Sequence, residues 1–172
     1  AIDLITPSNE ELIPSLEALN FSWESPGGNA LSIDYTLTLA YNDPEENSPS
    51  SSLENPNNLV MQCVITSSET TAPLPDQSYS FFQLTNMECE NNLSFECGKE
   101  YVWKVEAEEG EISDCPECSW NSESPIRTFV FGAITEGTYP INITVDTVLP
   151  EFMWDGICSD AQSYEIWVDD NP

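Results

Sequence analysis

The chain has 172 residues, of which 31 are acidic, three are basic and none is histidine, so its formal net charge is −28. Nucleic acids and anionic membrane surfaces are excluded as partners, because they need lysine and arginine and the chain offers only Lys99, Lys104 and Arg127. Histidine-based nucleophiles and histidine-ligated metals are excluded too. With 40% hydrophobic and 10% aromatic residues, the chain can still fold around a core.

Alternating apolar and polar residues predict short β-strands in the first half of the chain. A short strand is expected at 3–6. A second is expected at 19–24, where every second residue is apolar and one face of the strand is therefore buried. Further strands of this half are expected at 33–41, 59–66 and 78–84, with a long polar loop at 42–58.

Two more strands are expected at 100–107 and 126–131. In the first of these, Tyr101, Trp103 and Val105 lie on one side. Seven short alternating strands separated by turns are typical of a β-sandwich. We therefore predict an all-β fold, with one complete β-sandwich module at 1–132.

The C-terminal part of the chain repeats the pattern of the N-terminal part. Trp154 and Tyr164 repeat the positions of Trp23 and Tyr35 at a spacing of roughly 130 residues. A repeat of this period predicts tandem modules. The first strands of a second, incomplete module are therefore expected at 133–172. Three strands cannot close a sandwich. Either the native polypeptide continues, or a neighbouring subunit supplies the missing strands.

Three strand motifs and one turn motif carry a family resemblance. The strand motifs are Phe21-Ser22-Trp23, Tyr35-Thr36-Leu37 and Tyr101–Ala107, the last followed by Ser124 and Phe129. The turn motif places Phe95 and Gly98 before Tyr101, at the positions of a Leu-x-Pro-Gly-x-x-Tyr corner. Together they resemble the fibronectin type III family, particularly its divergent modules in bacterial secreted and cell-surface proteins.

The resemblance implies an immunoglobulin-like, fibronectin type III-like β-sandwich. Cys97 stands where the family has proline, and insertions at 42–58 and 85–97 make the module longer than usual. Modules of this family usually serve as spacers, adhesive units or carbohydrate-binding accessories, and they share no catalytic residues. The resemblance therefore implies a fold rather than an activity.

Six cysteines in a chain without histidine indicate an oxidising compartment, and hence an extracellular location. The disulfide candidates are Cys63, Cys89, Cys97, Cys115, Cys118 and Cys158. We expect Cys89 and Cys97 to form a short local disulfide that pins the insertion between them.

We expect Cys115 and Cys118 to form a structural staple in their loop. A redox dithiol would need a βαβ context, and a zinc site would need two further thiolates. Cys63 and Cys158 then remain. Either they pair across the two modules, or the partner of Cys158 lies in a missing part of the protein.

Two acidic clusters are candidate calcium sites, because calcium takes carboxylate and carbonyl oxygens from loops. Asp43, Glu45 and Glu46 form one cluster, and Asp146 with Glu151 lies near the junction between modules. Neither has the spacing of an EF-hand, so a solvated acidic surface is the alternative interpretation. No other cofactor is expected.

Two tryptophans are candidate interaction residues. Trp120 lies in a predicted loop, and Trp167 is out of phase with the apolar positions around it. If exposed, they would stack on sugar rings or pack against a neighbouring subunit; burial beneath an adjacent loop or module is the alternative. Glycosylation sequons begin at Asn20, Asn92 and Asn142, but abundant Asn and Ser/Thr would produce as many by chance.

These features predict a non-catalytic extracellular structural protein, a subunit or segment of a surface filament, sheath or adhesin. Its expected partners are copies of itself or further modules of the same chain. Membrane insertion is not expected, since no stretch approaches about 18 apolar residues. The alternative is a carbohydrate-binding accessory module of a larger secreted protein, with polysaccharide as its ligand. No enzyme is expected, because the carboxylates mostly occupy outward strand positions or loops.

Overall fold

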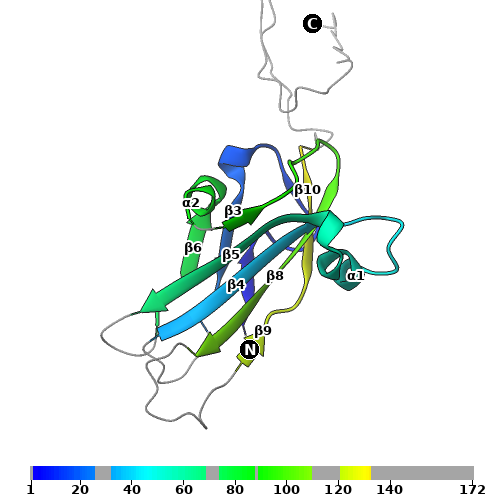
Figure 1. Cartoon of the computed structure of the whole chain (residues 1–172). Coiled ribbons are helices and arrows are strands. Elements are labelled where there is room, and N and C mark those ends of the chain that lie inside the picture. Colours follow the sequence, from blue (N-terminus) through cyan, green and yellow to red (C-terminus); the bar gives the residue numbers. More distant parts are fainter. Residues whose placement is uncertain (1, 26–31, 69–73, 88, 110–120, 133–172) are drawn as a thin grey trace, which may run out of the picture.

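The computed structural model describes residues 2–25, 32–68, 74–87, 89–109 and 121–132. Within these ranges the chain forms ten β-strands, two short α-helices and two 3-10 helices (Figure 1). The strands lie in two sheets, so the prediction of an all-β fold is confirmed. The second module expected at 133–172 lies outside the described residues.

The smaller sheet has three antiparallel strands in the order β1-β3-β6. They are β1 (Leu4–Thr6), β3 (Asn20–Trp23) and β6 (Gln77–Ser80). Helix α2 (Phe81–Thr85) follows β6 directly, and the 3-10 helix η1 (Leu16–Ala18) precedes β3. Both helices therefore flank the small sheet.

The larger sheet has seven strands in the order β2-β10-β8-β4-β5-β7, with β9 pairing to β8 beside this path. Only the pairing of β2 with β10 is parallel. The strands are β2 (Glu11–Ile13), β4 (Ser32–Tyr41), β5 (Leu59–Ser68), β7 (Cys89–Asn91), β8 (Glu100–Glu109), β9 (Asn121–Glu123) and β10 (Arg127–Phe131). Helix α1 (Pro49–Glu54) and the 3-10 helix η2 (Pro56–Asn58) lie between β4 and β5.

Aromatic side chains from the two sheets meet in one core. The rings of Phe21 in β3 and Trp103 in β8 lie edge to face, with centroids 5.1 Å apart. Trp23 and Tyr35 make a similar contact at 5.4 Å. All four side chains are fully buried. Burying one such side chain contributes about 2 kcal/mol, so these contacts hold the sheets together.

Strand alternation explains the agreement between sequence and structure in the large sheet. Register pairs Leu37 with Val105 and Leu39 with Trp103, and all four side chains face the core. The strands predicted at 3–6, 19–24, 33–41, 59–66, 100–107 and 126–131 are confirmed as β1, β3, β4, β5, β8 and β10.

One predicted strand is wrong in its second half. The strand expected at 78–84 ends at Ser80, and a helix begins at Phe81. The reason is a capping box. The Gln83 amide donates to Ser80 Oγ (3.1 Å), while the Ser80 amide donates to Gln83 Oε1 (2.8 Å). This local pair outweighs the strand preference of the two phenylalanines that follow.

The predicted loop at 42–58 contains helix α1 and the 3-10 helix η2. Ser48 caps α1 by accepting a hydrogen bond from the Ser51 amide, and Pro49 occupies the first turn, where a missing amide costs nothing. Strands β2, β7 and β9, of three residues each, were not predicted from the sequence, because they depend on distant partners for their pairing.

Candidate functional site

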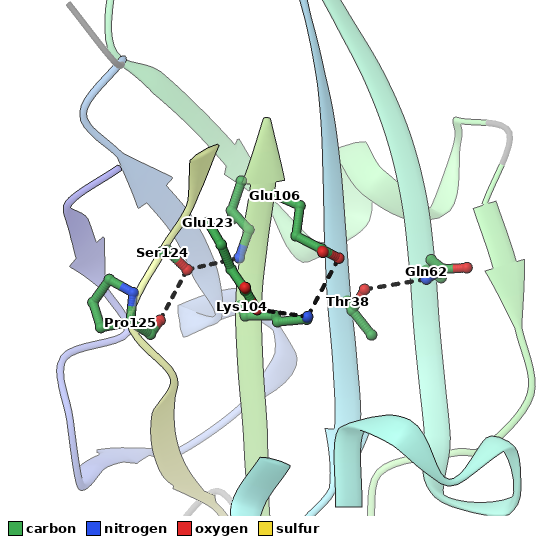
Figure 2. A network of polar contacts seen from close by, with 8 residues as sticks. Thr38, Gln62, Lys104, Glu106, Glu123, Ser124 and Pro125 are labelled. Atoms are coloured by element: carbon green, nitrogen blue, oxygen red, sulfur yellow. Dashed lines mark hydrogen bonds and ion pairs between the residues drawn. The ribbon is translucent and has the colours of Figure 1, made fainter. Parts of the chain in front are cut away.

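Polar side chains line the outer face of the large sheet across β5, β4 and β8. Cross-strand register places Gln62, Thr38 and Lys104 in one row. Gln62 Nε2 donates a hydrogen bond to Thr38 Oγ1 at 3.2 Å, and Figure 2 shows both side chains beside Lys104. This face is therefore an ordered polar surface.

Lys104 is the centre of the charged part of this face. Its Nζ lies 2.8 Å from Glu123 Oε1 on β9 and 3.4 Å from Glu106 Oε2 on its own strand (Figure 2). Partial burial acts to lower the pKa of Lys104. The hydrogen bond to Glu123 and the charges of both glutamates outweigh burial and hold that pKa above its ordinary value. Lys104 thus ties β9 to the sheet.

Ser124 completes the attachment of β9. Its Oγ accepts a hydrogen bond from the buried Val105 amide at 2.9 Å, and its own amide donates to the Val105 carbonyl at 2.8 Å. The Ser124 hydroxyl then donates to the Pro125 carbonyl (Figure 2). A side chain therefore takes the place of a ladder hydrogen bond where β9 ends.

An open hollow of about 330 Å³ lies on this face, next to the Lys104 cluster. Its walls come from β4, β8 and β9 and carry the carboxylates of Asp34, Glu106, Glu108 and Glu123. Within the described ranges, however, no three acidic or cysteine side chains are grouped so that they could hold a metal ion. The hollow is an acidic, solvent-open surface.

Two carboxylates of the first predicted calcium cluster accept hydrogen bonds within their own loop. Asp43 Oδ1 accepts a hydrogen bond from the Glu45 amide at 2.9 Å, and Glu46 Oε1 accepts one from Asn55 Nδ2 at 2.8 Å. The structure does not bring Asp43, Glu45 and Glu46 together as a metal-binding group. Asp146 and Glu151 lie outside the described residues.

A smaller hollow, of about 160 Å³, lies at the end of β4. It is lined by Tyr41, Leu93, Ser94, Glu96 and Tyr101. Leu93 is 43% exposed, and Lys99 Nζ lies 5.0 Å from the centre of the Tyr41 ring. The hollow therefore combines an aromatic ring with charged and hydroxyl groups.

The described disulfide joins Cys63 on β5 to Cys89 on β7. The expected Cys89–Cys97 pair is therefore wrong, and so is the alternative pairing of Cys63 with Cys158. The reason is geometric, because β7 runs back along β5 and places Cys89 directly opposite Cys63, with Cα atoms 4.3 Å apart. Cys97 is also disulfide-bonded. Cys115, Cys118 and Cys158 lie outside the described residues.

The remaining predicted site residues divide between described and undescribed parts of the chain. Asn20 and Asn92 are both exposed, so two of the sequons are sterically accessible. Asn142, Trp120 and Trp167 lie outside the described ranges. The Lys104 and Ser124 contacts were not predicted from the sequence, although the outward position of Lys104 in an alternating strand indicates a surface contact.

The chain was compared with known proteins. No protein-family model matches it, and no curated protein sequence does either. Separately, none of the helices in the described residues is long and apolar enough to cross a membrane.

Proposed function

We propose that the chain is a non-catalytic structural module of an extracellular surface assembly, a filament, sheath or adhesin built from fibronectin type III-like β-sandwiches. The observation that carries this proposal is a disulfide-linked, two-sheet module with a tyrosine corner. Modules of this kind transmit force and join to one another rather than perform chemistry. No catalytic residue is assigned.

The connections between strands support the immunoglobulin-like assignment. The chain crosses from the small to the large sheet between β3 and β4, and crosses back between β5 and β6. Such crossings between two packed sheets of mainly antiparallel strands are typical of immunoglobulin-like sandwiches. The aromatic contacts between β3 and β8 then lie where inward-facing residues of the two sheets should meet.

A tyrosine corner gives more specific support. Tyr101 lies at the start of β8, and its hydroxyl accepts a hydrogen bond from the Glu96 amide at 2.7 Å. Gly98, between them, has a φ of +76°, a conformation that favours glycine. A tyrosine near the start of a strand, bonded to backbone a few residues upstream, is characteristic of these sandwiches. Burial raises the pKa of Tyr101, so this hydroxyl keeps its proton at neutral pH.

The extracellular assignment is supported by the Cys63–Cys89 disulfide and by the charge of the chain. Disulfides persist in oxidising compartments. A net charge of −28 is tolerated best where salt or bound cations screen it, and a cation-rich exterior such as seawater would suit it. The acidic outer face described above fits a surface that stays hydrated between neighbouring modules.

Electron microscopy of the native material tests the proposal. We expect regular polymers or a continuous surface layer, with repeating units of the size of one module. Only monodisperse single particles, with no polymer under any salt condition, would show that the filament version is wrong.

The hollow beside Tyr41 favours a second candidate function, a carbohydrate-binding accessory module. An aromatic ring flanked by hydroxyl and charged groups is a common arrangement for sugar recognition. We would expect Tyr41→Ala to abolish retention on a polysaccharide matrix, with circular dichroism confirming that the fold survives the loss of the Tyr41–Tyr101 ring contact. Phe82→Ala is the matched control, because Phe82 is an exposed aromatic on α2. Equal retention of both variants would count against this candidate.

A further inference from the structure

One strand edge of the large sheet is open. Strand β5 runs from Leu59 to Ser68, but β7 pairs only with Met61, Gln62 and Cys63. On that side the five residues Val64–Ser68 have no partner strand within the described part of the chain. The other open edges there belong to strands of three or four residues, so this is the longest one.

Two observations show which backbone groups face this edge. The Asn92 amide donates to the Val60 carbonyl at 3.0 Å, so the backbone carbonyl of Val60 points toward the β7 side. The short Cα distance of 4.3 Å between Cys63 and Cys89 marks a pair without mutual ladder hydrogen bonds. The backbone N–H and C=O groups of the even-numbered residues of β5 therefore point away from β4, toward the open edge. Those of Val64, Thr66 and Ser68 are available to another strand.

The composition of β5 suits strand pairing. None of its ten residues is charged, although the chain carries 31 acidic residues. Val64 is 61% exposed, more than any other large hydrophobic residue described. Proteins usually protect a long edge with lysine, proline or a bulge, and the open part of β5 has none of these.

We propose that this edge pairs with the same edge of a second copy, in an antiparallel arrangement centred on Thr66. This inference rests on the proposed function as an assembly module, and it names the contact. Val64 would lie opposite Ser68 of the second copy, and the two Thr66 residues opposite each other. Because β7 occupies the edge up to Cys63, the two copies can pair only along residues 64–68. In the antiparallel arrangement these five residues of one copy lie opposite the same five residues of the other.

A second copy fits better than a partner of opposite charge. Pairing through β5 brings no like charges into cross-strand register, and it offers no carboxylate on the contacting strand to attract a basic peptide. Two chains with a net charge of −28 each repel one another over long distances. Salt screens this repulsion, since the Debye length falls from about 10 Å at 0.1 M to about 3 Å at 1 M. Association should therefore strengthen with ionic strength.

Sedimentation velocity on the full chain, with Thr66→Pro and Thr66→Val as paired variants, tests the contact. Both variants lose the hydrogen bond from Thr66 Oγ1 to Asp34 Oδ1, but only proline removes the edge-facing amide. We expect wild type and Thr66→Val to dimerise increasingly as NaCl is raised. Dimerisation of Thr66→Pro should be at least about tenfold weaker at every salt concentration.

Three outcomes would overturn the proposal. They are a wild type that stays monomeric at all salt concentrations, a Thr66→Pro variant that associates normally, and association that weakens as salt is added. Circular dichroism of both variants checks that the fold is retained. If native material forms polymers while Thr66→Pro behaves like wild type, the proposed function stands and only the β5 contact is wrong.

Discussion

The two edge regions of the large sheet, where β9 pairs with β8 and where β7 pairs with β5, are held by different interactions. On the β8 side, Lys104 holds β9 through Glu123 and also pairs with Glu106 on its own strand, while Ser124 satisfies a buried backbone amide. On the β5 side, the Cys63–Cys89 disulfide holds a three-residue strand, beyond which β5 is uncharged and has no partner strand among the described residues. The comparison indicates that one side is closed by polar contacts within the molecule, whereas the other remains available for pairing.

Removing the disulfide should have the largest effect on this comparison. The double variant Cys63→Ala, Cys89→Ala releases a loop whose ends are 26 residues apart. We expect it to lower the free energy of unfolding by about 3 kcal/mol, mainly because the unfolded chain gains freedom. Urea denaturation measures the loss. A change below about 1 kcal/mol would show that β7 does not depend on the disulfide.

Removing the Ser124 hydroxyl should have a smaller effect on the opposite side. Ser124→Ala leaves the buried Val105 amide without its acceptor, and we expect a loss of about 1–3 kcal/mol in unfolding free energy. Ser122→Ala, on β9 two residues before Ser124, is the control, and should cost less than about 0.5 kcal/mol. Equal losses for the two variants would mean that the hydroxyl has no specific role.

Alkaline pH should destabilise the folded state, including the contacts of Lys104 and Tyr101 on the β8 side. The pKa of Lys104 is raised by its glutamate partners despite burial, and burial raises the pKa values of Tyr35, Tyr79 and Tyr101. Groups with raised pKa values hold protons more tightly in the folded state. Their contribution is therefore complete below about pH 10 and is lost as pH rises through the folded pKa values.

We expect the urea midpoint to fall between about pH 9 and about pH 11. Lys104→Met should lower stability at neutral pH by at most about 1 kcal/mol, because the glutamates are partly solvated, and should make the alkaline fall shallower. A midpoint that rises with pH would contradict these assignments.

A charge on the open edge should have the smallest effect on stability. Val64→Lys should change the free energy of unfolding by less than about 0.5 kcal/mol, since Val64 is largely exposed. It should nevertheless weaken self-association, because a lysine on an edge strand disfavours edge-to-edge pairing. Leu93→Lys makes the same change of charge at another exposed position, and should associate like wild type.

The sequence predicted the parts of the fold that local alternation determines. The apolar phase of 33–41 and 100–107 was read correctly, because both strands bury one face along their whole length. The helix at Phe81 was missed although Ser80 and Gln83 have the spacing of a capping box. The strand was predicted there because the segment 78–84 is rich in apolar residues, and the capping-box spacing was not used.

The disulfide pairing could not be read from spacing. Cys97 is the nearer partner of Cys89 along the chain, but the register of β7 on β5 decides which thiol lies opposite. The same holds for Ser124, whose role depends on a backbone amide 19 residues away. The open edge of β5 could not be predicted either, because it depends on where the pairing with β7 ends. Non-local pairing was the missing information in all three cases.

Hydrogen exchange measured at increasing protein concentration in high salt tests the central claim most directly. If β5 pairs with its counterpart in a second copy, the amides of Val64, Thr66 and Ser68 should become protected as concentration rises, while the protection of Glu108 stays constant. Unchanged exchange at these three amides, or new protection confined to β1, β2 or β6, would contradict assembly through the β5 edge.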